Sequence, residues 1–561
     1  MRLPRSAFRH CRAPLLRRRT RCTLLAVLGA LAPATAVAQG YPGGGGGFGG
    51  GYGGGFGGFG GGSAIDRAIG LGVIGPAADD GEATSQSGWT FTSGVALSAT
   101  YSDNANLTST ADAGQEDIFL QVLPYASLSG EGARVKARGY IAPALYTGTI
   151  GGSPARIAPF MDLAGTVELV PDAFFLDGYA KASMVNNNAA GPGGGLGYNN
   201  YQYNSDNITP AFSFQLSPYV LRHLGTTANF YARLGIGTTN YGDSSGNNAL
   251  NANFESGFRS GSDFQRVPWH VFYRATRYDY NEQTSVDNGS KTSQQLVGRG
   301  SYVISPVWRV DASLGYENND YQTSRGETSG PTWSLGATWT PNQRVALSLG
   351  YGGQYFGNSW YLDYRYSHKR IGWFASYRTQ LTNTQQEFLQ SQTFLLTGPD
   401  GLPVVDPGTG QPIQVTQVSP TLTNESYVLR TFVTGIGWTG NRTRAGLDIT
   451  RNERDYQVTG EGQSDWGVGA RVSRDLSSDV TATARASWTN YDQGSTGTSD
   501  DSEAVDRWQA GVLLTKKLSR QSSISGAYDY RSNLFGTTSG STGSGSSGDE
   551  NRVAVIFNHA F

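Results

Sequence analysis

The strongest constraint on this sequence is an alternation of apolar and polar side chains, repeated in segments of about ten residues or more. In the first segment one face of an extended chain carries Trp89, Phe91, Val95, Leu97, Ala99 and Tyr101, and the other carries mainly threonine, serine and glycine. A strand that crosses a bilayer at a tilt needs about 9–11 residues and has aromatic residues at both interfaces. The segment therefore fits a transmembrane β-strand.

The same alternation recurs in pairs of segments joined by short turns. Between residues 331 and 355, for example, two apolar faces are separated by the turn Thr340-Pro341-Asn342-Gln343. We predict an all-β, antiparallel up-and-down barrel of about 22 strands, and boundary uncertainty allows about 20 to 24. The expected strands are 89–101, 117–129, 134–147, 158–170, 174–186, 207–221, 226–241, 249–258, 267–280, 291–304, 308–320, 331–340, 343–355, 358–368, 371–382, 425–438, 442–456, 464–474, 479–491, 506–517, 521–532 and 551–561.

The lengths of the connections support this count. Long polar links at 102–116, 187–206, 383–424, 492–505 and 533–550 all follow odd-numbered strands, whereas short turns mostly follow even-numbered ones. Bacterial outer-membrane barrels combine short periplasmic turns, long external loops and an even number of strands. We therefore expect an outer-membrane protein of a Gram-negative cell, surrounded by membrane lipid and lipopolysaccharide, with both termini in the periplasm.

Other classes fit the pattern less well. No stretch after residue 38 approaches 18 consecutive apolar residues, so the mature chain is not a helical membrane protein. A soluble β-sandwich or propeller is the alternative, but it would bury the apolar face of each strand and would not need aromatic residues at both strand ends.

The N-terminus has the features of a signal peptide. Eight arginines precede an uncharged apolar run from Cys22 to about Ala32, and Ala36-Val37-Ala38 has the small-residue pattern that signal peptidase cleaves. We predict a signal peptide at 1–38, cleaved between Ala38 and Gln39, with an uncleaved anchor as the alternative. Cleavage removes eight of the 43 basic residues and none of the 44 acidic ones, which leaves a net charge of about −9.

Residues 39–88 form a separate segment. Residues 40–62 are mostly glycine with interspersed tyrosine and phenylalanine, a composition that loses too much backbone entropy on folding to form a core. We expect a flexible periplasmic tail before a barrel at 89–561. The glycines are not a nucleotide site, because no strand precedes them and no helix follows; no nucleic-acid partner is expected.

If the apolar faces meet lipid, the other faces line the lumen, and many of their residues are cationic. These predicted lumen cations are Lys136, Arg138, Lys181, Arg233, Arg274, Arg299, Arg309, Arg365, Arg378, Arg444, Arg471, Arg485 and Arg507. They could bind an anionic or sugar-like solute, since guanidinium pairs bidentately with carboxylate or phosphate. Alternatively they pair with acidic residues of the wall, as Arg309 would with Asp311, Arg365 with Asp363 or Arg444 with Asp448.

Nothing in the sequence indicates an enzyme. After cleavage the histidines are His223, His270, His368 and His559, and they form no HExxH motif or metal-spaced cluster. Because both cysteines lie in the signal peptide, the mature chain has no thiolate ligand, and we expect no metal or other cofactor. A hydrolase with residues scattered over several strands stays an alternative, since triads are recognised by geometry.

Several stretches resemble outer-membrane barrels associated with the PEP-CTERM/exosortase protein-sorting system. They are Val167–Asp172 with Phe174–Asp177, Leu314–Tyr321, Trp339–Pro341, and Gly350–Gly352 with Tyr355–Gly357. The resemblance covers most of the mature chain and rests on strand and turn patterns. It implies that the protein lies in the outer membrane and that its gene lies near exopolysaccharide loci. The biochemical role in that family is largely unassigned.

The last residues also look like an assembly signal. Phe561 is terminal, and Val553, Val555 and Phe557 precede it at alternate positions, which resembles the pattern that the barrel-assembly machinery binds.

With only residues 39–88 before the first strand, we expect no room for the folded N-terminal plug of a 22-strand active transporter. We predict a passive conduit or export component for exopolysaccharide or another hydrophilic solute. The alternative is a non-conducting structural or adhesive barrel that acts through its external loops.

Overall fold

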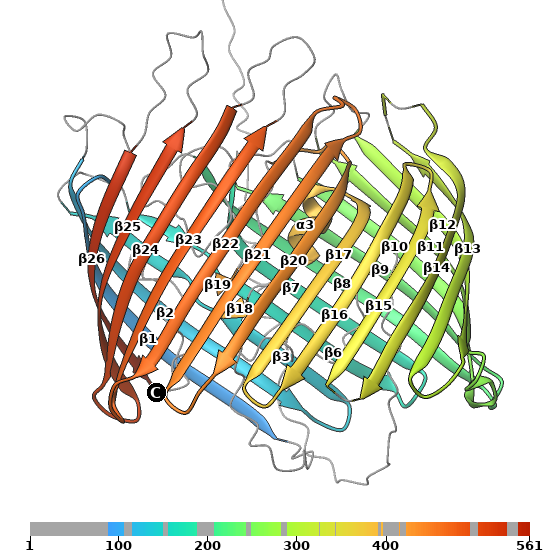
Figure 1. Cartoon of the computed structure of the whole chain (residues 1–561), viewed down its shortest axis with the longest axis horizontal. Coiled ribbons are helices and arrows are strands. Elements are labelled where there is room, and N and C mark those ends of the chain that lie inside the picture. The colour runs from blue at the N-terminus through green and yellow to red at the C-terminus, as the bar shows by residue number, and fades with distance from the viewer. Residues whose placement is uncertain are drawn as a thin grey trace, which may run out of the picture. The chain divides into compact units, whose positions relative to one another are not determined.

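In a computed structural model the chain forms one closed antiparallel β-barrel (Figure 1). The structure describes residues 88–105, 115–149, 155–187, 207–242, 248–281, 289–321, 323–324, 326–342, 344–390, 394–395, 414–415, 422–493, 503–535 and 548–561. The chain divides into two units, 1–50 and 51–561, and all the described residues belong to the second. The predicted signal peptide, the Ala38–Gln39 cleavage point and nearly all of the glycine-rich segment lie outside the described residues.

The barrel sheet consists of 24 strand segments. Their bounds are β1 Trp89–Ser102, β2 Asp117–Glu131, β3 Val135–Ile141, β4 Ala144–Gly148, β5 Arg156–Ala158, β6 Met161–Val170, β7 Phe174–Asn186, β8 Ile208–Leu224, β9 Ala228–Tyr241, β10 Ala249–Ser260, β11 Trp269–Tyr280, β12 Ser290–Val303, β13 Trp308–Asp320, β14 Ser329–Asn342, β15 Val345–Gln354, β16 Gly357–His368, β17 Ile371–Thr382, β20 Tyr427–Thr439, β21 Thr443–Tyr456, β22 Gly462–Asp475, β23 Val480–Gln493, β24 Glu503–Lys517, β25 Ser522–Phe535 and β26 Gly548–Ala560.

Two of the barrel strands are interrupted, which reconciles these segments with the predicted number. Pro143 separates β3 from β4, and Pro159 separates β5 from β6. A proline has no N–H to donate to the ladder, so each interruption is local. Counted as continuous strands, the segments make a 22-strand barrel, as the sequence predicts.

The first and last strands close the ring. β1 and β26 pair antiparallel from Gly94 opposite Ala560 to Ser102 opposite Arg552. Beyond the last paired residue, the Phe561 N–H donates to the Ser93 carbonyl at 2.8 Å. The C-terminus therefore lies at the end of the barrel that carries the short turns, which we call the turn end (Figure 1). The opposite end, where the longer connections lie, is the loop end.

The outer face of the barrel is apolar. Alternate side chains along the strands are exposed and hydrophobic; examples are Leu314, 73 % exposed, and Val555, 54 % exposed. Their neighbours in sequence point inward and are largely polar, with Thr100, Asp117 and Asp529 fully buried. No helix among the described residues is long and apolar enough to span a bilayer. An apolar belt outside and polar groups inside, on a closed ring of even strand number, is the arrangement of an outer-membrane β-barrel.

The inner wall is less uniformly polar than the alternation predicts. On β2 to β8 a group of inward-facing aromatic and aliphatic side chains is buried, including Phe119, Leu123, Tyr140, Tyr146 and Phe160. The strands in this region are apolar on both faces, so alternation alone identifies which face is outward but not the polarity of the inner one. The mixed polar lumen that we expected therefore holds for only part of the circumference.

One packing feature of the inner wall gives a test of the register. The Tyr361 ring lies across Gly336 and Gly350 on the neighbouring strands. A Cβ at Gly350 would clash with this ring, because it would lie closer to the ring atoms than a van der Waals contact allows. We expect Gly350→Val to expel this ring and to lower the free energy of unfolding by about 1–3 kcal/mol. Urea unfolding of the barrel in lipid vesicles measures the loss. Gly300→Ala is the control, because a Cβ there meets no atom within 4 Å; equal midpoints for the two variants would contradict the register.

Candidate functional site

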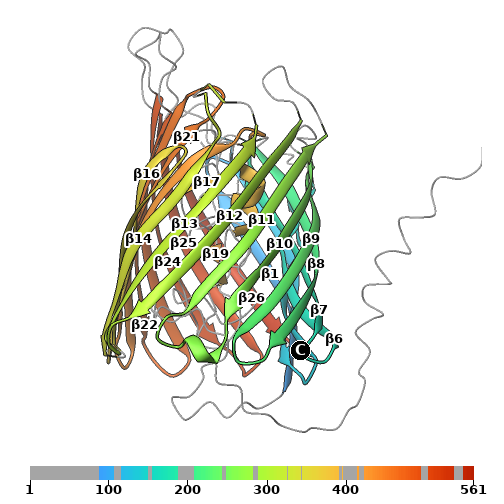
Figure 2. The same cartoon turned by 90° about the vertical axis from the view of Figure 1, so that its right-hand side faces the viewer.

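A short helix inside the barrel is the most distinctive feature of the lumen. α3, Thr384–Gln390, follows β17 at the loop end, and both views place it within the ring of strands (Figures 1 and 2). Asn383 precedes the helix, and its side-chain carbonyl accepts a hydrogen bond from the Gln386 N–H at 2.8 Å. This is an N-cap interaction, which stabilises the first turn of a helix. The connection at 383–424, expected as a long polar link, thus starts inside the barrel. The same connection also contains the two-residue strands β18, Phe394–Leu395, and β19, Gln414–Val415.

One side of α3 is held by strands β7 to β9. Phe388 packs in a buried cluster with Val185, Ala211 and Tyr241. The Lys181 ammonium donates to the Phe388 carbonyl at 2.9 Å and lies 4.9 Å from the centre of its ring. Lys181 is one of the predicted lumen cations, and its side chain is buried against the helix. A buried ammonium needs such partners because an unpaired charge is costly to desolvate.

The other side of α3 is held by strands β20 to β22. The Glu387 carboxylate accepts hydrogen bonds from the Arg454 guanidinium at 2.8 Å and from the Tyr427 hydroxyl at 2.5 Å. Arg454 is fully buried and also pairs with Asp465 at 2.6 Å. Asn452 donates to the second oxygen of Asp465 at 2.7 Å. The guanidinium is therefore shared between a carboxylate of the helix and a carboxylate of the wall.

These contacts anchor α3 to two separate parts of the barrel wall, so that the helix crosses the lumen. In the ring order, eight barrel strands separate β9 from β20, and eight also separate β22 from β7. The two groups of strands that hold the helix are thus on opposite sides of the barrel. We call the set formed by Lys181, Phe388, Glu387, Arg454 and Asp465 the α3 clamp. Since a helix with its side chains is about 10–12 Å wide, the clamp divides the lumen near the loop end.

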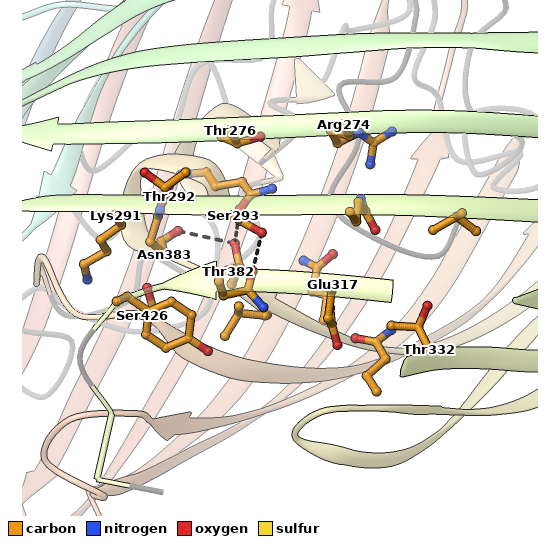
Figure 3. Close-up of a pocket in the computed structure, with 18 of the residues that line it drawn as sticks. Arg274, Thr276, Lys291, Thr292, Ser293, Glu317, Thr332, Thr382, Asn383 and Ser426 are labelled. Carbon is orange, nitrogen blue, oxygen red and sulfur yellow. Dashed lines mark hydrogen bonds between the residues drawn. The ribbon is translucent and has the colours of Figure 1, made fainter. Parts of the chain in front are cut away.

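A cavity lies between α3 and the wall formed by β11 to β17. Its volume is about 120 Å³, and the close-up in Figure 3 shows side chains from both the wall and the start of the helix pointing toward it. Most of its lining is polar but uncharged, as Thr276, Ser293, Thr332, Asn383 and Ser426 illustrate. Such groups can both donate and accept hydrogen bonds, which suits a hydrophilic solute or water.

The charged side chains of the cavity already have partners. Arg274 forms an ion pair with Glu255 at 2.7 Å, and the Lys291 ammonium donates to the Asn424 carbonyl. Glu317 accepts the Tyr355 N–H at 3.0 Å. Burial raises the pKa of the Tyr321 phenol, just beyond β13, above its ordinary value, so this hydroxyl adds no charge to the cavity. The charged groups of the cavity are thus paired with the wall or with the connection that follows α3.

The structure places the predicted lumen cations on the side of the sheet opposite the exposed apolar residues. Several form ion pairs with the wall; these are Arg233 with Asp177 at 2.8 Å, Arg309 with Asp311 at 3.1 Å, Arg365 and Arg378 with Asp363 at 3.4 and 3.5 Å, and Arg485 with Asp529 at 2.7 Å. Two of the pairs suggested by the sequence are therefore present. The pair of Arg444 and Asp448 stays a prediction.

The α3 clamp includes residues that we did not single out from the sequence. Arg454 and Asp465 lie on the inward face by the same alternation that identifies Arg444 and Arg471, and carrying the alternation to the strand ends would have included them. Glu387 lies in a connection without any alternation, and its only local signal is the capping residue Asn383. Within the described ranges, no group of three or more histidine, cysteine or acidic side chains could hold a metal ion.

Comparisons with known proteins add little beyond the fold. No protein-family model matches the sequence. No curated protein matches it either. Among solved structures, a mutant of the ferric enterobactin receptor from Pseudomonas aeruginosa is similar over 85 % of this chain and 81 % of that one, with 12 % identity and a TM-score of 0.46. The FrpB iron transporter from Neisseria meningitidis is similar over 84 % and 81 %, with 10 % identity and a TM-score of 0.46. The siderophore receptor PirA from Acinetobacter baumannii is similar over 84 % and 81 %, with 10 % identity and a TM-score of 0.45. Likenesses this weak carry no functional argument for the chain.

Proposed function

We propose that this outer-membrane barrel is a passive conduit or export component for a hydrophilic solute, and that the solute is an exopolysaccharide. The observation that carries the proposal is the polar cavity between α3 and the inner wall of β11 to β17. Uncharged hydroxyl and amide groups predominate there, and such groups exchange hydrogen bonds with water or with sugar hydroxyls at little cost. The resemblance to barrels found near exopolysaccharide loci supports the choice of polysaccharide.

The α3 clamp sets the width of this conduit. The helix is tied to both sides of the ring by buried ionic and aromatic contacts, so solute has to pass beside it. A conduit of this kind conducts ions less than an unobstructed ring of the same strand number would. It also keeps the opening fixed, because both sides of the helix are anchored to strands.

Purified full-length protein in a planar bilayer tests the proposal. We expect a stable, small conductance that neutral sugar oligomers reduce as their length increases, because each oligomer displaces ions from the passage beside α3. Linear polyethers of matched length serve as the control, since they lack the sugar hydroxyls. Equal block by both polymers would contradict the choice of polysaccharide. Absence of conductance at any voltage, both in the native protein and after α3 is released, would contradict the conduit and favour the adhesive alternative.

A further inference from the structure

A group of basic side chains lies at the turn end on four neighbouring hairpins. The hairpins β16–β17, β20–β21, β22–β23 and β24–β25 follow one another around the ring, because β17 pairs with β20, β21 with β22 and β23 with β24 (Figure 1). Their exposed cations are Lys369, Arg370, Arg442, Arg474, Lys516 and Arg520. We call this group the turn-end basic patch.

The positive charge of the patch is not neutralised by the wall. None of the six cations forms an ion pair with another described residue, and their one polar side-chain contact is from the Arg370 guanidinium to the side-chain Oδ1 of Asn441 at 2.7 Å. The acidic residues on these turns are Asp475 and Asp479, which accept hydrogen bonds from nearby hydroxyl groups, Thr481 at 2.9 Å for the former and Ser478 for the latter. The four adjacent turns thus carry six exposed cations and only two carboxylates.

The position of the patch relative to the apolar belt identifies the partner. Arg474 and Lys516 are the next outward-facing residues after Val472 and Leu514, each 48 % exposed on the belt. Trp438, close to the same end of β20, is also exposed, as expected where a barrel meets the bilayer interface. Long basic side chains at such a depth extend toward the lipid phosphates.

We infer that the turn-end basic patch binds the headgroups of anionic phospholipids in the leaflet that surrounds the turn end. The patch continues directly from the lipid-facing belt, so its occupant is a lipid rather than a soluble protein. A lipid with net negative charge is preferred over a zwitterionic one, because the headgroup ammonium of the latter repels the patch. Lipid binding at the turn end does not depend on what passes through the lumen.

Native mass spectrometry of the full-length protein tests this inference. Phosphatidylglycerol and phosphatidylcholine with identical acyl chains are titrated separately into the detergent-solubilised barrel. We expect the first phosphatidylglycerol to bind about tenfold more tightly, with a preference that falls as ionic strength rises. In a variant with Arg370→Gln, Arg442→Gln, Arg474→Gln and Lys516→Gln, the preference should fall below about twofold.

A matched control separates the patch from basic residues in general. Arg277 and Arg451 also face outward, but near the loop end, and each is paired with an acidic neighbour. Arg277→Gln with Arg451→Gln should leave the preference for phosphatidylglycerol unchanged. Equal affinities for the two lipids in the native protein, or a preference that survives in the patch variant, would overturn the inference. An electrophoretic mobility shift between heated and unheated samples shows that each variant remains folded.

Discussion

Replacement of Glu387 by alanine is expected to raise the single-channel conductance of the purified barrel several-fold. Glu387 is the helix residue that links α3 to Arg454 and Tyr427, whereas Arg454 keeps its second partner, Asp465, in the wall. The substitution therefore releases one side of the helix without leaving a buried guanidinium unpaired. Because an unpaired buried charge is what makes the loss of an ion-pair partner severe, the ring itself should stay intact. Planar-bilayer recording measures the change.

Two further variants distinguish release of the helix from general loosening of the barrel. Phe388→Ala removes the apolar contact on the opposite side, and together with Glu387→Ala it should widen the conducting passage further. Glu453→Ala is the matched control, because Glu453 lies on the outward face of β21 and pairs with Arg451 away from the helix. If the native protein and the Glu387 variant conduct equally, α3 does not limit the passage.

Replacement of Leu314 by arginine is expected to lower the free energy of unfolding of the barrel in the membrane by about 2–4 kcal/mol. Leu314 lies in the middle of β13 and is 73 % exposed on the lipid-facing side. An arginine near the bilayer midplane of a barrel costs about 2–4 kcal/mol, a large fraction of the stability of a typical domain. The urea midpoint of unfolding, followed by the faster electrophoretic migration of the folded fraction in unheated samples, should fall accordingly.

The depth dependence of this penalty provides its control. Leu518 is also exposed and apolar, but it lies in the turn between β24 and β25. Leu518→Arg should cost less than about 1 kcal/mol, because the penalty falls near the interface. If both substitutions lower the urea midpoint equally, Leu314 does not lie at the depth inferred from the belt.

The strands were predictable because lipid acts on each of them in the same way. A strand in a membrane barrel must place apolar side chains on every second position, and this requirement is visible in residues such as Leu447 and Ile449 without any knowledge of their neighbours. The strand number followed from the same signal, and the interruptions at Pro143 and Pro159 did not alter it. Local sequence was therefore sufficient to predict a strand wherever the residue type depends only on whether the side chain faces lipid or the lumen.

The interior was predictable only in part, since it depends on contacts between distant segments. Whether an inward arginine pairs with the wall or with α3 depends on which residues lie across the ring, and Arg454 and Glu387 are 67 positions apart. The burial of Phe119 and Tyr146 on the inner face could not be predicted either. In the sequence, an apolar residue on the inner face cannot be distinguished from a lipid-facing residue of a strand whose register is shifted by one position. The helix α3 is too short for a periodic pattern.

The seam between β1 and β26 has a consequence for biogenesis. Every other neighbouring pair in the ring is joined by a connection of the chain, but this pair brings together the segments that are synthesised first and last. Until Val553 to Phe557 align with Leu97 to Tyr101, both edges of the sheet present unpaired amide groups that hydrocarbon cannot satisfy. The nascent sheet cannot reside in lipid as an open ribbon. Stable residence in the bilayer therefore requires closure of the seam, which excludes truncated or stalled chains that lack the last strand.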